Sequence, residues 1–316
     1  MDSEPNSKEL AKPSQDSAPT LLVTELWGLG DLALAVPFLR AAAATRRVTL
    51  VAKPHAAPIV ARFVPAVEHV ALVAPWKAFR GKYRLFRWPW GQLGRTVGRL
   101  RSTGFEAGVS ARPDPRDHAL LMLAGARRRH GFPRSGSGLL LTSPLQRPAV
   151  PHRSEHWACL AKSLGFEIGP VEPARRNGRR ILIHAGAGQP ARLWPRERFE
   201  RLAAELGKAG WQTEIIDDSF SGIAKLLDKL DSADRFIGND SGPGHLAALL
   251  GVPTFTVFGP QLPELFSPRH PKAGWIEGAP CPYKPCSDYC RFSEPRCLTA
   301  IDAEIAIRRV FQWLET

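Results

Sequence analysis

Short apolar runs alternate with longer mixed segments through the first half of the chain. Four of these runs are predicted strands: residues 21–24, 48–52, 67–73 and 107–110. The first run is followed by a glycine turn at residues 28–30 and then by an apolar segment, residues 32–44, which is long enough for a helix. A strand, a glycine turn and a helix in this order predict a parallel, doubly wound sheet.

The same alternation restarts after residue 180. Four more apolar runs are predicted strands: residues 181–183, 213–216, 235–238 and 254–258. Helices are predicted between them at residues 196–209 and 245–250. Two stretches rich in Pro and Arg, residues 144–153 and 170–180, bracket a helical segment at residues 156–164. We expect one of these two stretches to be the linker between the halves.

These patterns predict an α/β chain with two Rossmann-like domains and a cleft between them. The length of 316 residues agrees, because single domains commonly have about 100–200 residues. We place the domains at residues 20–172 and 173–316. Residues 1–19 mix Ser, Pro and charged residues without periodicity, which is typical of a disordered tail.

The composition is that of an ordinary soluble globular protein, with 44% hydrophobic and 23% charged residues. No apolar stretch approaches the roughly 20 residues that a membrane-spanning helix needs. The N-terminal tail lacks the apolar centre of a signal peptide. We therefore expect a cytoplasmic protein.

The formal net charge of +13 is unevenly distributed. Residues 80–101 hold seven Lys or Arg residues and no acid, interleaved with aromatic residues. Such a segment attracts anionic lipid, a phosphorylated glycolipid or nucleic acid. The candidates for contact with an acceptor or a membrane are Arg84, Arg87, Trp88 and Trp90. A solvated basic face and tryptophans packed in the core are the alternatives. No nucleic-acid motif is present, so we expect no nucleic-acid partner.

Glycines follow two of the predicted strands in the second half. Gly186 and Gly188 follow the first strand, and residues 240–244 follow the third. The carboxyl ends of parallel strands are where open α/β sheets bind ligands. Residues 240–245 lead into a helix, whose free N–H groups and positive dipole end suit a diphosphate. The alternative is that Asp240 or Ser241 only caps this helix.

The run from Phe236 to Thr254 resembles the signature of glycosyltransferase family 9, the ADP-heptose:lipopolysaccharide heptosyltransferases. Further segments are similar to the family in the same order along the chain: residues 27–31, 125–132, 184–188, 192–195 and 258–260. The resemblance implies a GT-B fold, with the acceptor bound by the first domain and the donor nucleotide by the second. It also implies an inverting transfer that requires no metal or other cofactor.

The same resemblance implies roles for individual residues. Asp31 would be the general base, and Arg192, Ser241 and Gly242 would contact the diphosphate. The remaining donor-binding residues would be His184, Gly186, Gly188, Asp240 and His245. The implied donor is an ADP-sugar, and the implied acceptor is an anionic glycolipid of the lipopolysaccharide-core type. From the basic residues between 80 and 101 we expect peripheral attachment to the inner face of the inner membrane.

Residues 217–234 are shorter than in the family, where a further strand and helix precede the signature. A part of the nucleotide pocket is therefore trimmed. Two alternatives to a heptosyltransferase follow from this. One is a family 9 relative with another donor or acceptor, and the other is a non-catalytic glycolipid-binding protein.

Four of the five cysteines lie in a Cys-rich segment, residues 281–297. Cys281, Cys286, Cys290 and Cys297 supply the four thiolates that a tetrahedral zinc or iron ion needs. Their spacing differs from the close cysteine pairs of common zinc motifs. We therefore consider a structural metal, with reduced thiols and a local disulfide as the two alternatives.

Overall fold

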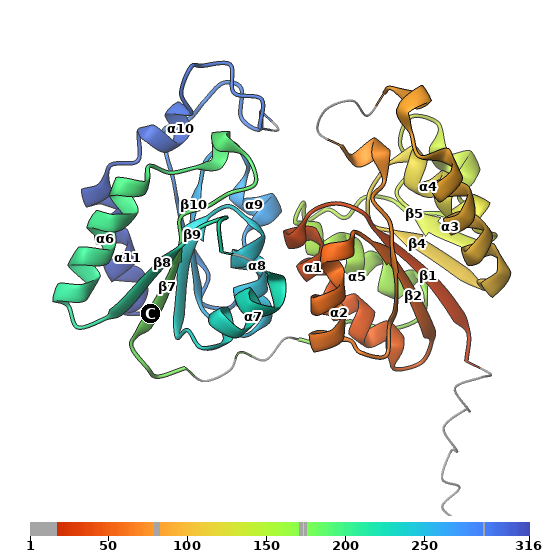
Figure 1. Cartoon of the computed structure of the whole chain (residues 1–316), viewed down its shortest axis with the longest axis horizontal. Helices are drawn as coiled ribbons and strands as arrows, with labels where there is room; N and C mark the ends of the chain where they lie inside the picture. The colour runs from red at the N-terminus through yellow and green to blue at the C-terminus, as the bar shows by residue number, and fades with distance from the viewer. Residues whose placement is uncertain (1–17, 79–82, 171–172, 174–175, 221, 287) are drawn as a thin grey trace, which may run out of the picture.

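The computed structural model describes residues 18–78, 83–170, 173, 176–220, 222–286 and 288–316. Figure 1 shows two lobes side by side, each built on its own sheet. The tail predicted at residues 1–19 lies almost entirely outside the described residues. No helix of the described part is both long and apolar enough to span a membrane.

The first lobe contains a six-stranded parallel sheet in the order β3-β2-β1-β4-β5-β6. Its strands are β1 (Thr20–Glu25), β2 (Arg47–Ala52), β3 (Glu68–Ala71), β4 (Ala107–Ser110), β5 (Arg128–Gly131) and β6 (Ser143–Pro144). Its helices are α1 (Leu29–Ala43), α2 (Ala57–Phe63), α3 (Trp90–Thr103), α4 (Pro115–Leu123) and α5 (Arg153–Ser163). Short 3-10 turns are η2 (Pro54–Ala56), η3 (Pro75–Lys77), η4 (Leu85–Arg87) and η5 (Ser137–Leu140). The order reverses between β1 and β4, so the predicted doubly wound sheet is confirmed.

The second lobe contains a five-stranded parallel sheet in the order β11-β10-β9-β7-β8. Its strands are β7 (Arg180–His184), β8 (Gln212–Ile216), β9 (Arg235–Asn239), β10 (Thr254–Phe258) and β11 (Gly274–Glu277). Its helices are α6 (Arg196–Lys208), α7 (Ile223–Asp231), α8 (Gly242–Leu249), α9 (Pro263–Phe266), α10 (Arg296–Thr299) and α11 (Ala303–Leu314), with the 3-10 turn η6 (Pro190–Arg192) before α6. The order reverses between β7 and β9.

The central strands are short apolar runs because both of their faces are covered by helices. Five of the six residues of β1 are buried, and so are four of the five residues of β7. Strands that are buried on both faces are typical of parallel sheets in α/β proteins. The apolar runs of the sequence therefore predict these strands well.

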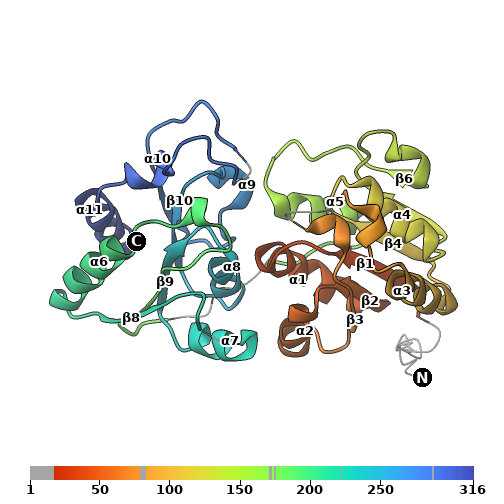
Figure 2. The same ribbon diagram turned by 45° about the horizontal axis from the view of Figure 1, so that its top comes forward.

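One hydrophobic cluster extends across both lobes. Helix α1 packs against α8 and α2 packs against α7, as Figures 1 and 2 show. Leu226 and Leu230 of α7 and Leu246 of α8 belong to the same buried cluster as Phe38 of α1. The shortened segment 217–234 thus supplies a helix to the junction between the lobes, and β8 forms an edge of the second sheet.

Ion pairs support the same junction at the surface. The two terminal nitrogens of Arg62 on α2 lie 2.7 Å from carboxylate oxygens of Asp228 and Asp231 on α7. Helix α5 packs against α1 inside the first lobe. Of the two stretches rich in Pro and Arg, the one at residues 170–180 therefore connects the two sheets.

Candidate active site

The predicted site residues lie where each sheet reverses its strand order. Asp31 follows β1, and Arg112, which the sequence analysis did not predict, follows its neighbour β4. In the second sheet, Arg192 follows β7 and Asp240 follows its neighbour β9. The carboxyl ends of strands at such a reversal are the usual ligand-binding position of open α/β sheets.

The first turns of α1 and α8 are in contact across the junction of the lobes. A β-carbon on Gly30 would lie 2.7 Å from Cδ2 of His245, and one on Gly242 would lie 2.6 Å from Cβ of Leu29. Real β-carbons do not come this close to other atoms, so both positions need glycine for the lobes to approach. Burial lowers the pKa of His245 to about 4, which leaves its imidazole neutral at pH 7.

Asp31 is the third residue of α1, which begins three residues before the predicted helix start at residue 32. Its Oδ2 accepts a hydrogen bond from the Gly28 N–H at 3.3 Å. Its Oδ1 accepts a hydrogen bond from the guanidinium of Arg112. Asp31 therefore caps the helix from inside its first turn and also holds an ion pair from another loop.

Arg112 and Glu25 are polar residues of this region that the sequence analysis did not predict. The carboxyl group of Glu25 is buried at the end of β1 and accepts a hydrogen bond from the Trp27 N–H at 3.0 Å. Burial, followed by the charge of Asp31, raises the pKa of Glu25 to about 8, although Arg112 opposes this shift. Glu25 is therefore mostly protonated at pH 7.

Two cations lie against the indole ring of Trp27, beside Asp31. Nζ of Lys77 is 4.4 Å from the ring centroid and the guanidinium carbon of Arg112 is 4.6 Å from it. Such distances are typical of cation–π contacts. Trp27 keeps 39% of its surface exposed. Trp27 therefore contacts both Lys77 and Arg112, and Arg112 is the ion-pair partner of the predicted base.

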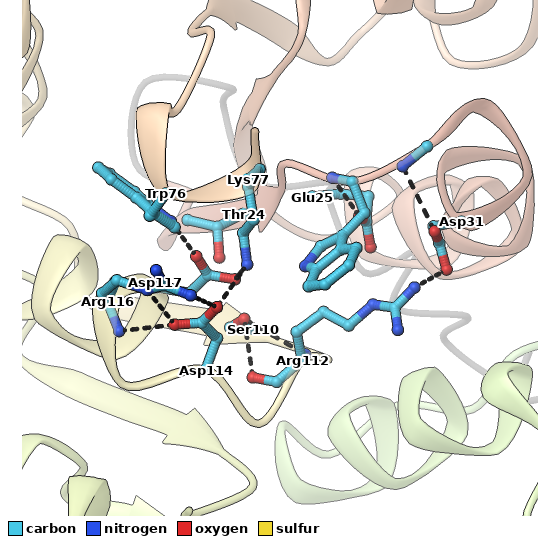
Figure 3. A network of polar contacts seen from close by, with 12 residues as sticks. Thr24, Glu25, Asp31, Trp76, Lys77, Ser110, Arg112, Asp114, Arg116 and Asp117 are labelled. Atoms are coloured by element: carbon cyan, nitrogen blue, oxygen red, sulfur yellow. Dashed lines mark hydrogen bonds and ion pairs between the residues drawn. The ribbon is translucent and has the colours of Figure 1, made fainter. Parts of the chain in front are cut away.

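Lys77 belongs to a buried network that Figure 3 shows beside the Asp31–Arg112 pair. Its ammonium group lies 3.0 Å from Asp114 and 2.8 Å from Asp117. The indole N–H of Trp76 donates to Asp117, and Arg116 donates to Asp114. Each buried charge in the network has a partner of opposite charge, which burial requires. The network fixes the end of β4 and the start of α4.

On the side of the second lobe, Arg192 lies between two carboxylates. Its NH1 is 3.3 Å from Oδ2 of Asp240, and its Nε and NH2 bond both oxygens of Asp288 at 2.7 and 2.8 Å. Burial raises the pKa of Asp240 to about 6, although the charge of Arg192 opposes this shift. Asp288 lies in the Cys-rich segment and, like Arg112 and Glu25, was not predicted by the sequence analysis.

Several polar atoms around the start of α8 have no protein partner among the described residues. They are Oγ of Ser241, Nδ1 of His184 and Nδ1 of His245, all buried. Ser241 is the N-cap residue of α8, but its side chain makes no capping hydrogen bond. Because buried polar atoms normally have partners, this region fits a polar ligand better than it fits a cap alone.

The glycine turn after β7 is bound by the shortened segment 217–234. Asp218 accepts a hydrogen bond from the Ala187 N–H at 3.0 Å and lies 3.7 Å from Nε2 of His184. A β-carbon on Gly186 would lie 2.6 Å from Cγ of Asp218, whereas one on Gly188 would meet no atom within 4 Å. Gly186 is therefore needed for this packing, and Gly188 faces open space.

Residues 79–82 of the basic aromatic segment are outside the described residues. Trp88 is half-buried and packs against Trp76, with 5.6 Å between the ring centroids. Arg84, Arg87 and Trp90 are exposed. Of the four predicted contact residues, Trp88 is packed and the other three face solvent. These three make no described contact with Asp31.

The four cysteines of the Cys-rich segment have free thiols and line one pocket with Tyr283, Phe292 and Arg296. Burial raises the pKa of Cys286 and of Cys297. Within the described ranges, no group of three or more His, Cys, Asp or Glu residues is arranged to hold a metal ion. The zinc or iron ion therefore stays a prediction.

Two lipopolysaccharide heptosyltransferases are similar to part of this sequence. The enzyme named lipopolysaccharide heptosyltransferase 1 of Pseudomonas aeruginosa is 38% identical over 91 residues, 29% of this chain and 24% of that protein. Its namesake in Campylobacter coli is 29% identical over 112 residues, 27% of this chain and 32% of that protein. The matches span about a third or less of these relatives.

Two solved structures have the same fold along nearly the whole chain. E. coli heptosyltransferase WaaC with ADP has a TM-score of 0.74 at 16% identity, and the match covers 93% of this chain and 99% of that one. The iron-containing dodecameric glycosyltransferase TibC of enterotoxigenic E. coli has a TM-score of 0.56 at 16% identity, with 94% of this chain and 76% of that one covered. At these identities the likeness is one of fold, which confirms the GT-B architecture with two Rossmann-like domains.

Residues 220–294 match the model of glycosyltransferase family 9 (heptosyltransferase). This range contains the signature run, helix α8 and most of the Cys-rich segment. The family model, the two sequence relatives and the shared fold agree with the resemblance found in the sequence. The signature region of the chain is therefore similar to glycosyltransferase family 9, and the chain as a whole shares the GT-B fold.

Proposed function

We propose that the chain is an inverting glycosyltransferase that transfers a sugar from an ADP-sugar to a hydroxyl group of an anionic glycolipid. The contact between Gly30 of α1 and His245 of α8 carries this proposal. It brings Asp31, one residue after Gly30, close to the start of α8, where Arg192 and Ser241 lie. An inverting transfer needs a base on one side of the sugar carbon and a diphosphate site on the other.

The leaving diphosphate would be neutralised by groups of the second lobe. The first turn of α8 presents the positive end of the helix dipole. Arg192 adds a guanidinium, and the unpartnered hydroxyl of Ser241 adds a donor. These groups supply the charge stabilisation that other enzymes obtain from a divalent cation. We therefore propose that turnover needs no metal.

The proposed donor is ADP-heptose or a related ADP-sugar. WaaC, which has the same fold, was solved with ADP, and both sequence relatives are named as lipopolysaccharide heptosyltransferases. The proposed acceptor is accordingly a glycolipid of the lipopolysaccharide-core type. Another donor or acceptor is the alternative, because β8 is the edge strand of the second sheet and the sequence resemblance implies a further strand and helix here in the family.

We also propose that the protein attaches peripherally to the inner face of the inner membrane. Tyr83, Phe86 and Trp90 expose 79%, 81% and 56% of their surfaces, and Arg84 and Arg87 lie between them in the sequence. Exposed aromatic rings among cations suit the interface of an anionic bilayer. Attachment there would bring the first lobe to a membrane-embedded acceptor.

The experiment that tests the function combines binding with turnover. Calorimetry with ADP should show binding to the wild type and much weaker binding to Arg192→Ala. The control is Arg201→Ala, because Arg201 is an exposed arginine of α6 that pairs with Glu304 outside the site. Transfer from ADP-heptose to a lipopolysaccharide acceptor would then be measured. ADP binding without transfer to any tested acceptor would favour the non-catalytic binding protein, and equal binding by all three proteins would remove Arg192 from the site.

A further inference from the structure

A guanidinium and a carboxylate from distant parts of the second lobe form a two-point ion pair. Arg192 lies in η6, directly after the glycine turn, and Asp288 lies 96 residues later in the Cys-rich segment. Nε donates to Oδ1 at 2.7 Å and NH2 donates to Oδ2 at 2.8 Å. Their side chains are 26% and 11% exposed. Paired contacts of this kind fix the orientation of an arginine as well as its position.

Asp288 is itself held in place. Nε2 of Gln261, a buried residue after β10, donates to Oδ1 of Asp288 at 3.3 Å. The backbone of Asp288 has φ of +69°, in the left-handed region that residues with a β-carbon rarely adopt, although aspartate is among those that tolerate it. The Cys-rich segment therefore places this carboxylate at one defined point beside Arg192.

The ion pair leaves one nitrogen of Arg192 weakly bonded. NH1 lies 3.4 Å from the carbonyl oxygen and 3.3 Å from Oδ2 of Asp240. Charge-assisted hydrogen bonds are normally shorter, about 2.7–2.9 Å. Asp240 directly precedes Ser241 and the first turn of α8. NH1 thus faces the proposed diphosphate site, while the opposite edge of the guanidinium is held by Asp288.

We propose that Asp288 is a positioning residue for donor binding, and that the Cys-rich segment is thereby part of the donor site. The proposal rests on the proposed function, because the bound group is the diphosphate of the donor. A free arginine has many rotamers, and ordering it on binding costs affinity. Asp288 orders Arg192 before the donor arrives, so that NH1 meets the diphosphate without this cost.

A counter-ion role for Asp288 predicts the opposite effect on ADP binding. If its carboxylate were a counter-ion that the diphosphate has to displace, removing its charge would strengthen ADP binding. If it only supported the fold of the Cys-rich segment, removing it would weaken ADP binding whether or not Arg192 were present. The sign of the effect and its dependence on Arg192 therefore separate the three roles.

The test is calorimetry of ADP binding to Asp288→Asn. Asparagine keeps the size of the side chain and tolerates the left-handed backbone, but it lacks the charge and the second oxygen that accepts from Arg192. We expect ADP to bind about tenfold more weakly to this variant than to the wild type, within the range of coupling between contacting residues. In an Arg192→Ala background, the same change should have almost no further effect.

Two matched variants complete the experiment. Glu277→Gln removes an ion pair with Lys284 of the same segment in which Arg192 takes no part, and should leave ADP binding unchanged. Arg192→Lys keeps the charge but cannot form the two-point pair, so it should lose ADP affinity as Asp288→Asn does. If Asp288→Asn folds poorly, Arg192→Lys still tests the pair. Unchanged or tighter ADP binding by Asp288→Asn, or an equal loss in the Arg192→Ala background, would overturn the positioning role. A wild type that fails to bind ADP would overturn the proposed function and this role together.

Discussion

Asp31 and Arg112 form an ion pair between the first turn of α1 and the loop after β4, although 81 residues separate them in the sequence. Both side chains are mostly buried, with 19% and 11% exposed. The pair therefore restrains the carboxylate that we propose as the base. It also places a cation where an anionic acceptor would approach Asp31.

Replacing Arg112 with Ala tests this restraint. We expect turnover to fall by about tenfold, which corresponds to about 1.4 kcal/mol of lost transition-state stabilisation, because Asp31 loses its orienting partner. ADP affinity should stay unchanged, since the proposed donor groups lie on the other lobe. Arg116→Ala is the matched control, because Arg116 pairs with Asp114 in the same region and does not contact Asp31 in the described structure. Full activity of Arg112→Ala would show that the pair is dispensable.

The buried carboxyl of Glu25 predicts a pH-dependent stability. Its pKa is about 8 in the folded chain, above the ordinary value of 4.5. A group with a raised pKa contributes stability that is fully present below the unfolded pKa and is lost as the pH rises through the folded pKa. Glu25→Gln lacks this titration, so its free energy of unfolding relative to the wild type should increase between about pH 5 and about pH 9. Denaturant unfolding of both proteins gives the difference in their free energies of unfolding at each pH. Equal differences at the two pH values would contradict the raised pKa of Glu25.

The strands at the centre of each sheet were predictable because burial on both faces leaves continuous apolar runs. The runs that became β1, β7, β9 and β10 are of this kind. Strand β5, with the sequence Arg-Arg-His-Gly, has no such run and was missed. Helix α7 was also missed, because residues 217–234 were interpreted only as shorter than in the family, although the leucines of α7 are buried at the junction of the lobes.

The candidate site residues could be named from the sequence where they belong to a local motif, and not where their proposed role depends on a distant partner. The motifs around Asp31 and residues 240–242 contain their own glycine turns and helix starts. Arg112 and Asp288 acquire their roles from Asp31 and Arg192, which lie 81 and 96 residues away. Glu25 stands at the polar end of an apolar run, and nothing in the local pattern indicates that its carboxyl is buried.

Attachment to anionic membranes should depend on the exposed arginines of the basic aromatic segment. Replacing both Arg84 and Arg87 with Gln should weaken binding to anionic vesicles by up to about 1 kcal/mol per residue. The control replaces Arg308 and Arg309 with Gln, since these exposed residues of α11 carry the same charge on the other lobe. Vesicle sedimentation at low and high salt measures both variants. Wild-type binding that is insensitive to salt, or equal losses in the two variants, would contradict an electrostatic role for this segment.

The role of Asp31 as general base is separable from its role at the helix start. The carboxylate accepts hydrogen bonds from the Gly28 N–H and from the Arg112 guanidinium. Asp31→Asn keeps an oxygen that can accept one of these bonds, but its side chain cannot take a proton. If Asp31 deprotonates the acceptor hydroxyl, this variant should fold and bind ADP like the wild type but turn over more slowly by roughly 10²–10⁴-fold, the usual range for a general base. The rate is measured with ADP-heptose and acceptor in the presence of EDTA, so that the same assay tests the independence from metal. Arg112→Ala serves as the comparison, because it disturbs the same ion pair without removing the proton acceptor, and its loss should be the smaller of the two. A folded Asp31→Asn protein with wild-type turnover would mean that Asp31 serves only the helix and the ion pair, and the base would then have to be another residue.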